Sequence, residues 1–380
     1  MASGGSPASR KSRIARGVKA VVRDPKAVSR LWRRGDVSLS AGELSGFRDA
    51  DGQESRIFFV VGFPKSGTTW LMETLDAHPE VLCRGEGRFF DRGMRREHFK
   101  GMETSAETTK QKLQPASLYN ALAEDEYLKM WVERSVWSRD DDAEEHLKNL
   151  TRLAAGYFLR AKLSASGKQM VGDKTPLSSD TVVAEIADLF PDAKVVHLVR
   201  DGRDAAVSLI HHNWKRASDR GGVRRFSAEE TEKRDRYWKD PTSFGTSGES
   251  LFTEKRLRHV AEIWGSRVSA ARRDGRSLLG GNYTELRYED LLERPEKVFG
   301  GVFSFLGADA NEKTVHRCAE ATSFERRSGG RQRGQEDAKS GVRKGVAGDW
   351  KGVFTERDRT IFDEEAGPAL AEVGYERSDG

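Results

Sequence analysis

Apolar and polar positions along the chain predict parallel strands separated by helices. Residues 57–61 and 194–200 form short apolar runs without alternation, which is typical of strands buried on both faces. A further strand is predicted over 283–288, and a short one ends at Gly172. Helical periodicity begins at Thr68 and returns over 180–189, 204–213, 257–273, 290–306 and 311–321. This order indicates an α/β fold, a doubly wound sheet with central parallel strands and helices on both faces.

Two segments interrupt this pattern. Residues 91–165 combine charged clusters with helical periodicity and are predicted to be a helical insertion. Residues 216–256 are polar and irregular, and we expect a mobile loop or a helical excursion there. There is no internal repeat, so one domain is predicted over 55–376, preceded by a tail over 1–50.

A glycine turn joins the first strand to the first helix. Gly62 and Gly67 bracket it, so free backbone N–H groups and the helix dipole are expected to bind a phosphate. Nucleotide-triphosphatase loops place a lysine directly after the second glycine. Here Thr68 takes that position and the lysine is Lys65. The shift argues against an ATPase and for a different phosphorylated donor.

The turn resembles the 5′-phosphosulfate loop of the sulfotransferases, which use 3′-phosphoadenosine-5′-phosphosulfate (PAPS) as sulfuryl donor. The matching stretch is Pro-Lys-Ser-Gly-Thr-Thr-Trp over 64–70. The resemblance implies a P-loop-like sheet, with Lys65 at the leaving phosphate and bridging oxygen and Trp70 stacked on the adenine. The 5′-phosphate would be held by Ser66, Gly67, Thr68 and Thr69.

A second motif follows the strand over 194–200. By the same resemblance, Arg200 and Ser208 bind the 3′-phosphate, which needs a fork-shaped cation and a hydroxyl donor. The alternative is that Arg200 only pairs with a carboxylate such as Asp201 or Asp204. Arg203 is expected to face solvent.

A third motif, Arg-Lys-Gly-Val-Ala-Gly-Asp-Trp-Lys over 343–351, resembles the C-terminal signature of the family. It implies that Arg343, Lys344 and Gly345 close over the 3′-phosphate. Residues 326–345 are predicted to be a lid that orders when the donor arrives. Smaller matches imply that Tyr288, Thr322 and Phe324 line the adenine site.

The general base is the open part of this prediction. Small-molecule members carry Lys-Thr-His, but this chain has Lys174-Thr175-Pro176. Carbohydrate-type members use a glutamate shortly before a Phe-Phe pair, which matches Glu86. We therefore predict Glu86 as base and Lys174 as a cation near the sulfuryl group. Two alternatives stay open: Glu86 is an exposed loop carboxylate, or the base is His211 or His212.

Composition sets the remaining expectations. The 380 residues include only two cysteines, no run of about 20 apolar residues and no secretory signal, so a cytoplasmic protein is predicted. Residues 1–36 carry a net charge of +8, which leaves −3 for the rest of the +5 total. This tail is suited to weak contact with an anionic membrane, although a solvated segment is the simpler interpretation. No nucleic-acid partner is expected, and no residue spacing indicates a metal site.

Together these features predict a PAPS-dependent sulfotransferase acting on an acceptor hydroxyl of a sugar, glycolipid or small metabolite. The insertions at 91–165 and 216–256 are expected to form the acceptor side. Two other classes are weighed against it. A nucleotide kinase or GTPase would have a lysine after Gly67, and a non-catalytic binder would lack Lys65 or Glu86. The acceptor and the oligomeric state are left open by the sequence.

Overall fold

A computed structural model describes residues 56–90, 117–123, 125–219, 226–246, 248–337 and 340–377, with only the backbone for 216–219. The predicted tail over 1–50 and parts of both insertions, including 91–116, lie outside these residues. The described chain belongs to one compact unit, which begins at Ser55. The predicted domain and insertion limits therefore stay predictions.

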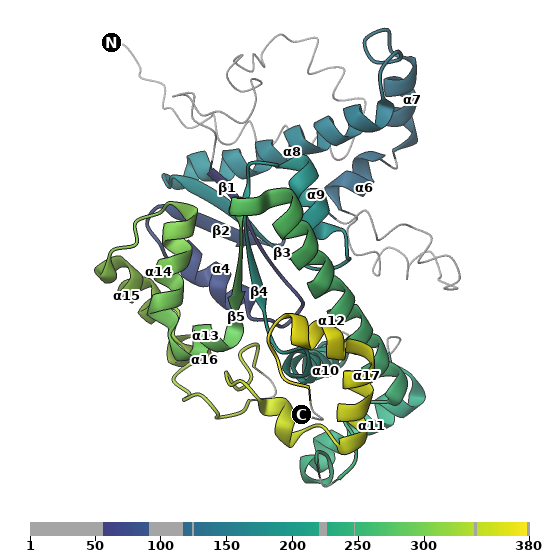
Figure 1. The fold of residues 1–380 in the computed structure, drawn as a ribbon, viewed down its shortest axis with the longest axis vertical. Coiled ribbons are helices and arrows are strands. Elements are labelled where there is room, and N and C mark those ends of the chain that lie inside the picture. Colours follow the sequence, from purple (N-terminus) through teal and green to yellow (C-terminus); the bar gives the residue numbers. More distant parts are fainter. Residues whose placement is uncertain are drawn as a thin grey trace, which may run out of the picture. The chain divides into compact units, whose positions relative to one another are not determined.

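Five parallel strands form the central sheet in the order β2-β3-β1-β4-β5 (Figure 1). They are β1 (Arg56–Gly62), β2 (Val81–Gly85), β3 (Met170–Pro176), β4 (Lys194–Val199) and β5 (Tyr283–Arg287). β1 lies in the middle, between β3 and β4. The chain proceeds to opposite edges of the sheet from there, which makes the carboxyl end of β1 the usual ligand position of an open α/β sheet.

Helices cover both faces of the sheet (Figure 1). Those before β4 are α4 (Thr68–Asp76), α6 (Leu118–Ala123), α7 (Glu126–Arg134), α8 (Ala143–Ser166) and α9 (Val182–Leu189). Those after it are α10 (Gly202–Asp219), α11 (Ala228–Lys239), α12 (Glu254–Asp274), α13 (Tyr288–Glu293), α14 (Pro295–Leu306), α15 (Glu312–Ala321), α16 (Phe324–Ser328) and α17 (Glu356–Glu372). Short 3-10 turns η3 (Pro241–Ser243), η5 (Gly280–Asn282) and η6 (Asp349–Gly352) and a π-helical segment (Gly275–Leu279) complete the described elements.

Alternate residues of β1 face different cores. Phe58 and Val60 join a cluster with α4, α14 and α15, while Phe59 packs against Phe90 and Phe190 on the other face. A second cluster joins α10, α12 and α17 around Trp214 and other fully buried side chains. Both faces of the sheet are therefore buried, which explains why the strand sequences do not alternate.

The α/β class and the parallel sheet were predicted correctly, but several elements differ. β3 continues to Pro176 rather than stopping at Gly172, so Asp173 and Lys174 lie on the strand itself. β2 and α17 were not predicted. Within the irregular segment over 216–256, the structure contains helix α11, which begins with a capping box between Ser227 and Glu230.

Candidate functional site

The loop after β1 has the backbone of an anion cradle. Gly67 precedes α4 with φ 97°, and a Cβ there would lie 2.6 Å from the ring of Tyr288. Lys65 also has a positive φ, 75°. Because α4 has no side-chain N-cap, its first N–H groups are left for a ligand.

Positive charge converges on Lys65 from four other parts of the chain. Burial, followed by the charges of Arg200, Lys174, Arg343 and Lys215, lowers the pKa of Lys65 to about 8. These residues come from the ends of β4 and β3, the motif over 343–351, and α10. Among the described residues, Lys65 has no carboxylate in ion-pair contact. A buried cation surrounded by cations favours an anionic ligand.

Arg200 lies in the wall of the same site. Its guanidinium donates to the carbonyls of Lys65 and Val346, each at 3.1 Å, and lies 4.4 Å from the ring centre of Tyr288. Its nearest carboxylate oxygen, on Asp204, is 3.7 Å away, so the alternative of an ion pair is partly realised. Nε of Arg200 is buried without a hydrogen-bond partner.

Two further buried donors near this wall have no partner: Oγ of Ser66 and Nε of Arg343. Buried polar atoms are normally hydrogen-bonded. Donors without acceptors beside a cluster of cations fit a ligand rich in negatively charged oxygens. The residues present therefore suit the phosphates of a donor nucleotide.

The carboxyl ends of β2 and β3 bring Glu86 and Lys174 together. Gly85 pairs with Lys174 across the two strands, and Nζ of Lys174 donates to Glu86 at 2.5 Å. Asp173 accepts from the N–H of Gly87 at 2.8 Å and from the hydroxyl of Thr175 at 2.7 Å. The Glu86 loop is thus fixed from β3, while the Glu86 side chain keeps about a third of its surface exposed (37%).

The C-terminal motif docks on α10. Asp204 accepts hydrogen bonds from the N–H groups of Gly348 at 2.7 Å and Trp350 at 3.0 Å. The prediction that Arg203 faces solvent is wrong, because Arg203 is buried, paired with Asp201 at 2.8 Å and stacked 3.8 Å from the ring centre of Trp350. The tryptophan of the motif supplies a buried surface for Arg203 that the sequence around Arg203 alone does not reveal.

The residues predicted for the adenine lie on one side of the glycine turn. Trp70 is almost fully buried and meets Tyr288 and Phe299 edge-on. Phe324 is also buried, and a Cβ on Gly345 (φ 66°) would lie 2.3 Å from its ring. Their proposed contacts with a base stay predictions, as does that of the buried Thr322, whose hydroxyl is hydrogen-bonded to that of Thr74. Thr69, predicted for the 5′-phosphate, is exposed, and its role also stays a prediction.

The two candidate histidines lie on α10 rather than beside Glu86. His211 packs against Trp214 and Tyr237, and burial, followed by the charge of Arg343, lowers the pKa of His211 to about 4. Such a histidine is neutral at pH 7 and a weak base. Ser208, one turn earlier, and His212 are half-buried.

Three roles in this site were not predicted from the sequence, although Asp204 was named there as a possible partner of Arg200. Asp173 supports the Glu86 loop, Asp204 ties the motif over 343–351 to α10, and Lys215 acts on Lys65. For Lys215 a signal existed, because it lies two helical turns after Ser208 and so shares its face. For the docking role of Asp204 no such signal existed, because the two N–H groups that donate to it are more than 140 residues away.

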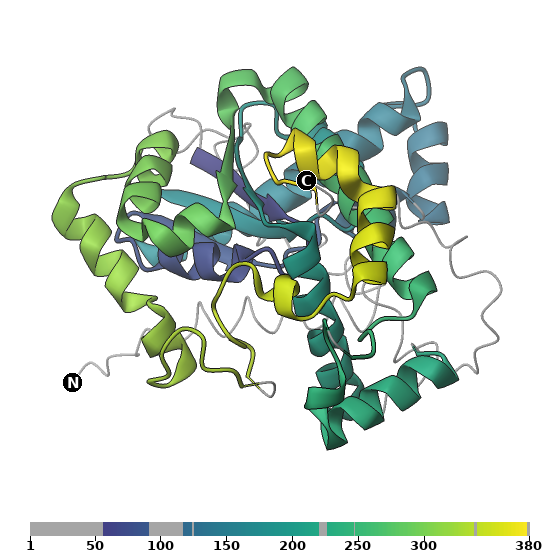
Figure 2. The same cartoon turned by 60° about the horizontal axis from the view of Figure 1, so that its bottom comes forward.

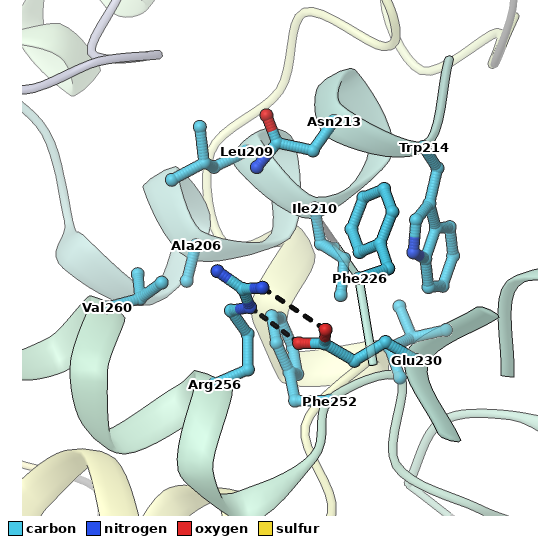
Figure 3. Close-up of a pocket in the computed structure, with 11 residues that line it drawn as sticks. Ala206, Leu209, Ile210, Asn213, Trp214, Phe226, Glu230, Phe252, Arg256 and Val260 are labelled. Carbon is cyan, nitrogen blue, oxygen red and sulfur yellow. Dashed lines mark hydrogen bonds and ion pairs between the residues drawn. The ribbon is translucent and has the colours of Figure 1, made fainter. Parts of the chain in front are cut away.

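A separate pocket lies between α10, α11 and α12 (Figure 3). Apolar side chains line most of it, and an ion pair joins Arg256 to Glu230 at 2.6 Å. Its residues on α10 are Ala206, Leu209, Ile210, Asn213 and Trp214. Helical spacing places them on the face of α10 opposite Ser208 and Lys215, so this pocket is distinct from the cation cluster.

The described part of the chain lacks the features of two other classes of site. No three His, Cys, Asp or Glu side chains come together there as they do around a metal ion. None of the helices described is long and apolar enough to cross a membrane.

The parallel sheet, the glycine turn at its carboxyl edge and the converging cations define a P-loop-like α/β protein with a site suited to an anion. The family model described as the sulfotransferase domain matches residues 55–374. The chain therefore belongs to the sulfotransferase domain family, and the predicted family is confirmed.

Curated relatives match over part of their length. Protein-tyrosine sulfotransferase A of Caenorhabditis elegans is 28% identical over 178 residues, which cover 46% of this chain and 39% of the relative. The protein-tyrosine sulfotransferase of Drosophila melanogaster is 27% identical over 161 residues, 42% of this chain and 26% of the relative. The chain thus spans less than two-fifths of either protein.

Solved sulfotransferase structures align more extensively. A mouse sulfotransferase complexed with PAP covers 88% of this chain and 93% of its own, at 18% identity and a TM-score of 0.43. The sulfotransferase STF9 from Mycobacterium avium covers 98% and 87%, at 15% identity and a TM-score of 0.45.

Proposed function

We propose that this protein transfers the sulfuryl group of PAPS to an acceptor hydroxyl. The observation that carries the proposal is the convergence of Lys65, Arg200, Lys174, Arg343 and Lys215 at the glycine turn. Such a site suits a ligand with several phosphate groups. The mouse structure named as a complex with PAP, the desulfated donor, agrees with this choice.

The donor's phosphates are assigned to two halves of the site. The 5′-phosphosulfate lies on the turn over 65–69, with Nζ of Lys65 at the bridging oxygen. The 3′-phosphate lies between Arg200, Ser208 and the lid segment (residues 326–345). Buried donors without partners on Ser66, Arg200 and Arg343 support both assignments.

In the proposed reaction, Glu86 accepts the proton of the acceptor hydroxyl as the acceptor oxygen bonds to sulfur. The bond between sulfur and the 5′-phosphate oxygen breaks, and its electron pair stays on 3′-phosphoadenosine-5′-phosphate. Lys174, which holds Glu86 at 2.5 Å, orients the carboxylate and lies near the sulfuryl oxygens. Lys65 stabilises the charge that develops on the leaving phosphate.

The first experiment is calorimetric titration with 3′-phosphoadenosine-5′-phosphate, ATP and GTP in magnesium-free buffer. We expect tight binding of the bisphosphate alone, and loss of that binding in Lys65→Ala. Preference for ATP or GTP, or no binding of any of the three, would contradict the proposed donor.

The acceptor is proposed as a hydroxyl of a sugar, glycolipid or small metabolite, because Glu86 before Phe89-Phe90 matches the carbohydrate-type pattern. A tyrosyl hydroxyl is the second candidate, since two relatives are named protein-tyrosine sulfotransferases. Transfer of radiolabelled sulfate to a panel of sugars, phenols and tyrosine peptides separates the two. Labelled peptide without labelled sugar would reject the first candidate.

A reducing, cytoplasmic compartment is part of the same proposal. Cys83 and Cys318 are buried free thiols, and burial raises the pKa of each. Both are thus suited to a structural role in the core rather than to a disulfide framework. Imaging of the tagged chain in its native cell tests the assignment, and a signal confined to a membrane-bound organelle would reject it.

A further inference from the structure

The lid segment carries an acidic residue that the family signature does not account for. Glu336 lies on the first of two facing stretches, 334–337 and 342–344. The N–H of Gly334 donates to the carbonyl of Lys344 at 2.9 Å, and that of Asp337 donates to the carbonyl of Arg343 at 3.1 Å. This backbone pairing holds Glu336 opposite Arg343.

Both ends of the Arg343 fork are occupied by carboxylates. Nη1 donates to Glu336 at 2.7 Å, and Nη2 donates to Asp349. Lys344 also pairs with Asp349, at 2.5 Å, and lies 3.9 Å from Glu336. Two cations and two anions are thus balanced at the point where the 3′-phosphate is proposed to bind.

The two carboxylates differ in how firmly they are held. The Asp349 side chain is 6% exposed and contacts both cations, whereas that of Glu336 is 34% exposed. An exposed ion pair contributes little free energy, and its side chain can turn toward water. Glu336 is therefore the carboxylate that a stronger anion can displace from Arg343. Glu336 and Arg343 both belong to the yellow-green segment between α16 and η6 (Figure 2).

We propose that Glu336 is an internal competitor for Arg343, which weakens retention of nucleotides that carry a 3′-phosphate. The inference rests on the proposed function, because it takes Arg343 as a 3′-phosphate contact. A dianionic 3′-phosphate carries more charge than a single carboxylate and can displace Glu336 from the Arg343 guanidinium. A nucleotide that lacks a 3′-phosphate leaves the Glu336–Arg343 pair in place. When the spent donor leaves, Glu336 takes Arg343 back, which favours release of the product.

The test compares Glu336→Gln with the wild type in two titrations, one with 3′-phosphoadenosine-5′-phosphate and one with adenosine-5′-phosphate. We expect the variant to bind the bisphosphate roughly fivefold tighter, with a slower dissociation rate in stopped-flow, and to bind the monophosphate unchanged. In an Arg343→Ala background, Glu336→Gln should have no effect on either ligand. The matched control is Glu254→Gln, which removes a carboxylate paired with Arg258 at 2.9 Å on α12.

Each outcome decides the matter. Bisphosphate binding that is unchanged or weaker in Glu336→Gln overturns the inference, as does an equal gain for both nucleotides. Those results leave the donor assignment intact if the wild type still prefers the bisphosphate. A wild type that does not distinguish the two nucleotides rejects the proposed donor, and this inference with it.

Discussion

Lys65 is the residue on which the electrostatics of the site depend. Its ammonium is buried beside four other cations, so the unliganded protein holds it in its charged form at a free-energy cost. An anion that binds there removes the cost. The same arrangement makes ligand binding sensitive to the protonation of a single lysine.

Affinity for 3′-phosphoadenosine-5′-phosphate should fall as pH rises through about 8, the pKa of Lys65 in the free protein. The sign follows because a bound anion raises that pKa, so binding is strongest where the lysine is already charged. Titration calorimetry between pH 6.5 and pH 9.5 measures the fall, at roughly tenfold per pH unit above the pKa. In Lys65→Arg, whose side chain stays charged, the pH dependence of the affinity should disappear. If the pH dependence persists in this variant, another group causes it.

Glu86→Gln should lower turnover by about 10²- to 10⁴-fold, the usual contribution of a general base. Donor-product affinity should stay within a few-fold of the wild type, because Glu86 is assigned to the acceptor. Sulfate transfer and calorimetry on the same preparation measure the two effects. If Glu86→Gln keeps full turnover while His211→Ala abolishes it, the base has been wrongly assigned.

Among the elements, α10 organises the site. Ser208 and Lys215 lie on one of its faces and the pocket of Figure 3 lies on the opposite face. Near its first turn, Asp204 holds the C-terminal motif through two backbone N–H groups. Burial raises the pKa of Asp204, and the charge of Arg200 and the hydrogen bonds from Trp350 and Gly348 offset only part of that shift.

Asp204→Ala should destabilise the protein and weaken donor binding. The buried N–H of Trp350 loses its acceptor, at about 1–3 kcal/mol, and the part-buried N–H of Gly348 loses its acceptor at a smaller cost. Urea unfolding and limited proteolysis near 340–348 measure the loss of docking. Asp204→Asn keeps one acceptor oxygen, so its stability should lie between those of the wild type and Asp204→Ala. If Asp204→Ala shows wild-type stability and proteolysis, the motif is held by other contacts.

How far the sequence predicts these elements depends on the range of the contacts involved. The glycine turn and the strands around Val60 and Val196 are local patterns, so they could be read directly. Only Val81, Leu82 and Cys83 are buried in β2, too few for a recognisable run. The burial of Arg203 depends on a segment that folds back over α10, and no local pattern indicates it. The pairing of Glu336 with Arg343 depends on two facing stretches of an irregular segment, which no periodicity indicates.

At the scale of the whole molecule, charge is divided between the first 36 residues and the rest. The former carry +8 and the remainder −3. If the tail is a separate segment, as predicted, donor binding should not require the tail. Attraction to an anionic surface should require it.

A chain that begins at residue 51 should keep the wild-type affinity for 3′-phosphoadenosine-5′-phosphate and unfold cooperatively. The full chain should sediment with vesicles rich in phosphatidylserine at low ionic strength, and the shortened chain should not. Neutral vesicles and high salt are the controls. Equal sedimentation of both chains would place the membrane contact outside the tail, and loss of donor affinity would make the tail part of the domain.

The cations around Lys65 come from positions 174 to 343, and the carboxylate that holds Arg343 from the buried side is Asp349. During synthesis, the ribosome releases all five strands of the sheet about sixty residues before it releases this last part of the site. A nascent chain can therefore complete its sheet while it is still unable to retain the donor. Nucleotide binding at the proposed site then becomes possible only after translation of the C-terminal motif. A chain truncated after β5 would contain the sheet but not the residues proposed to retain the nucleotide.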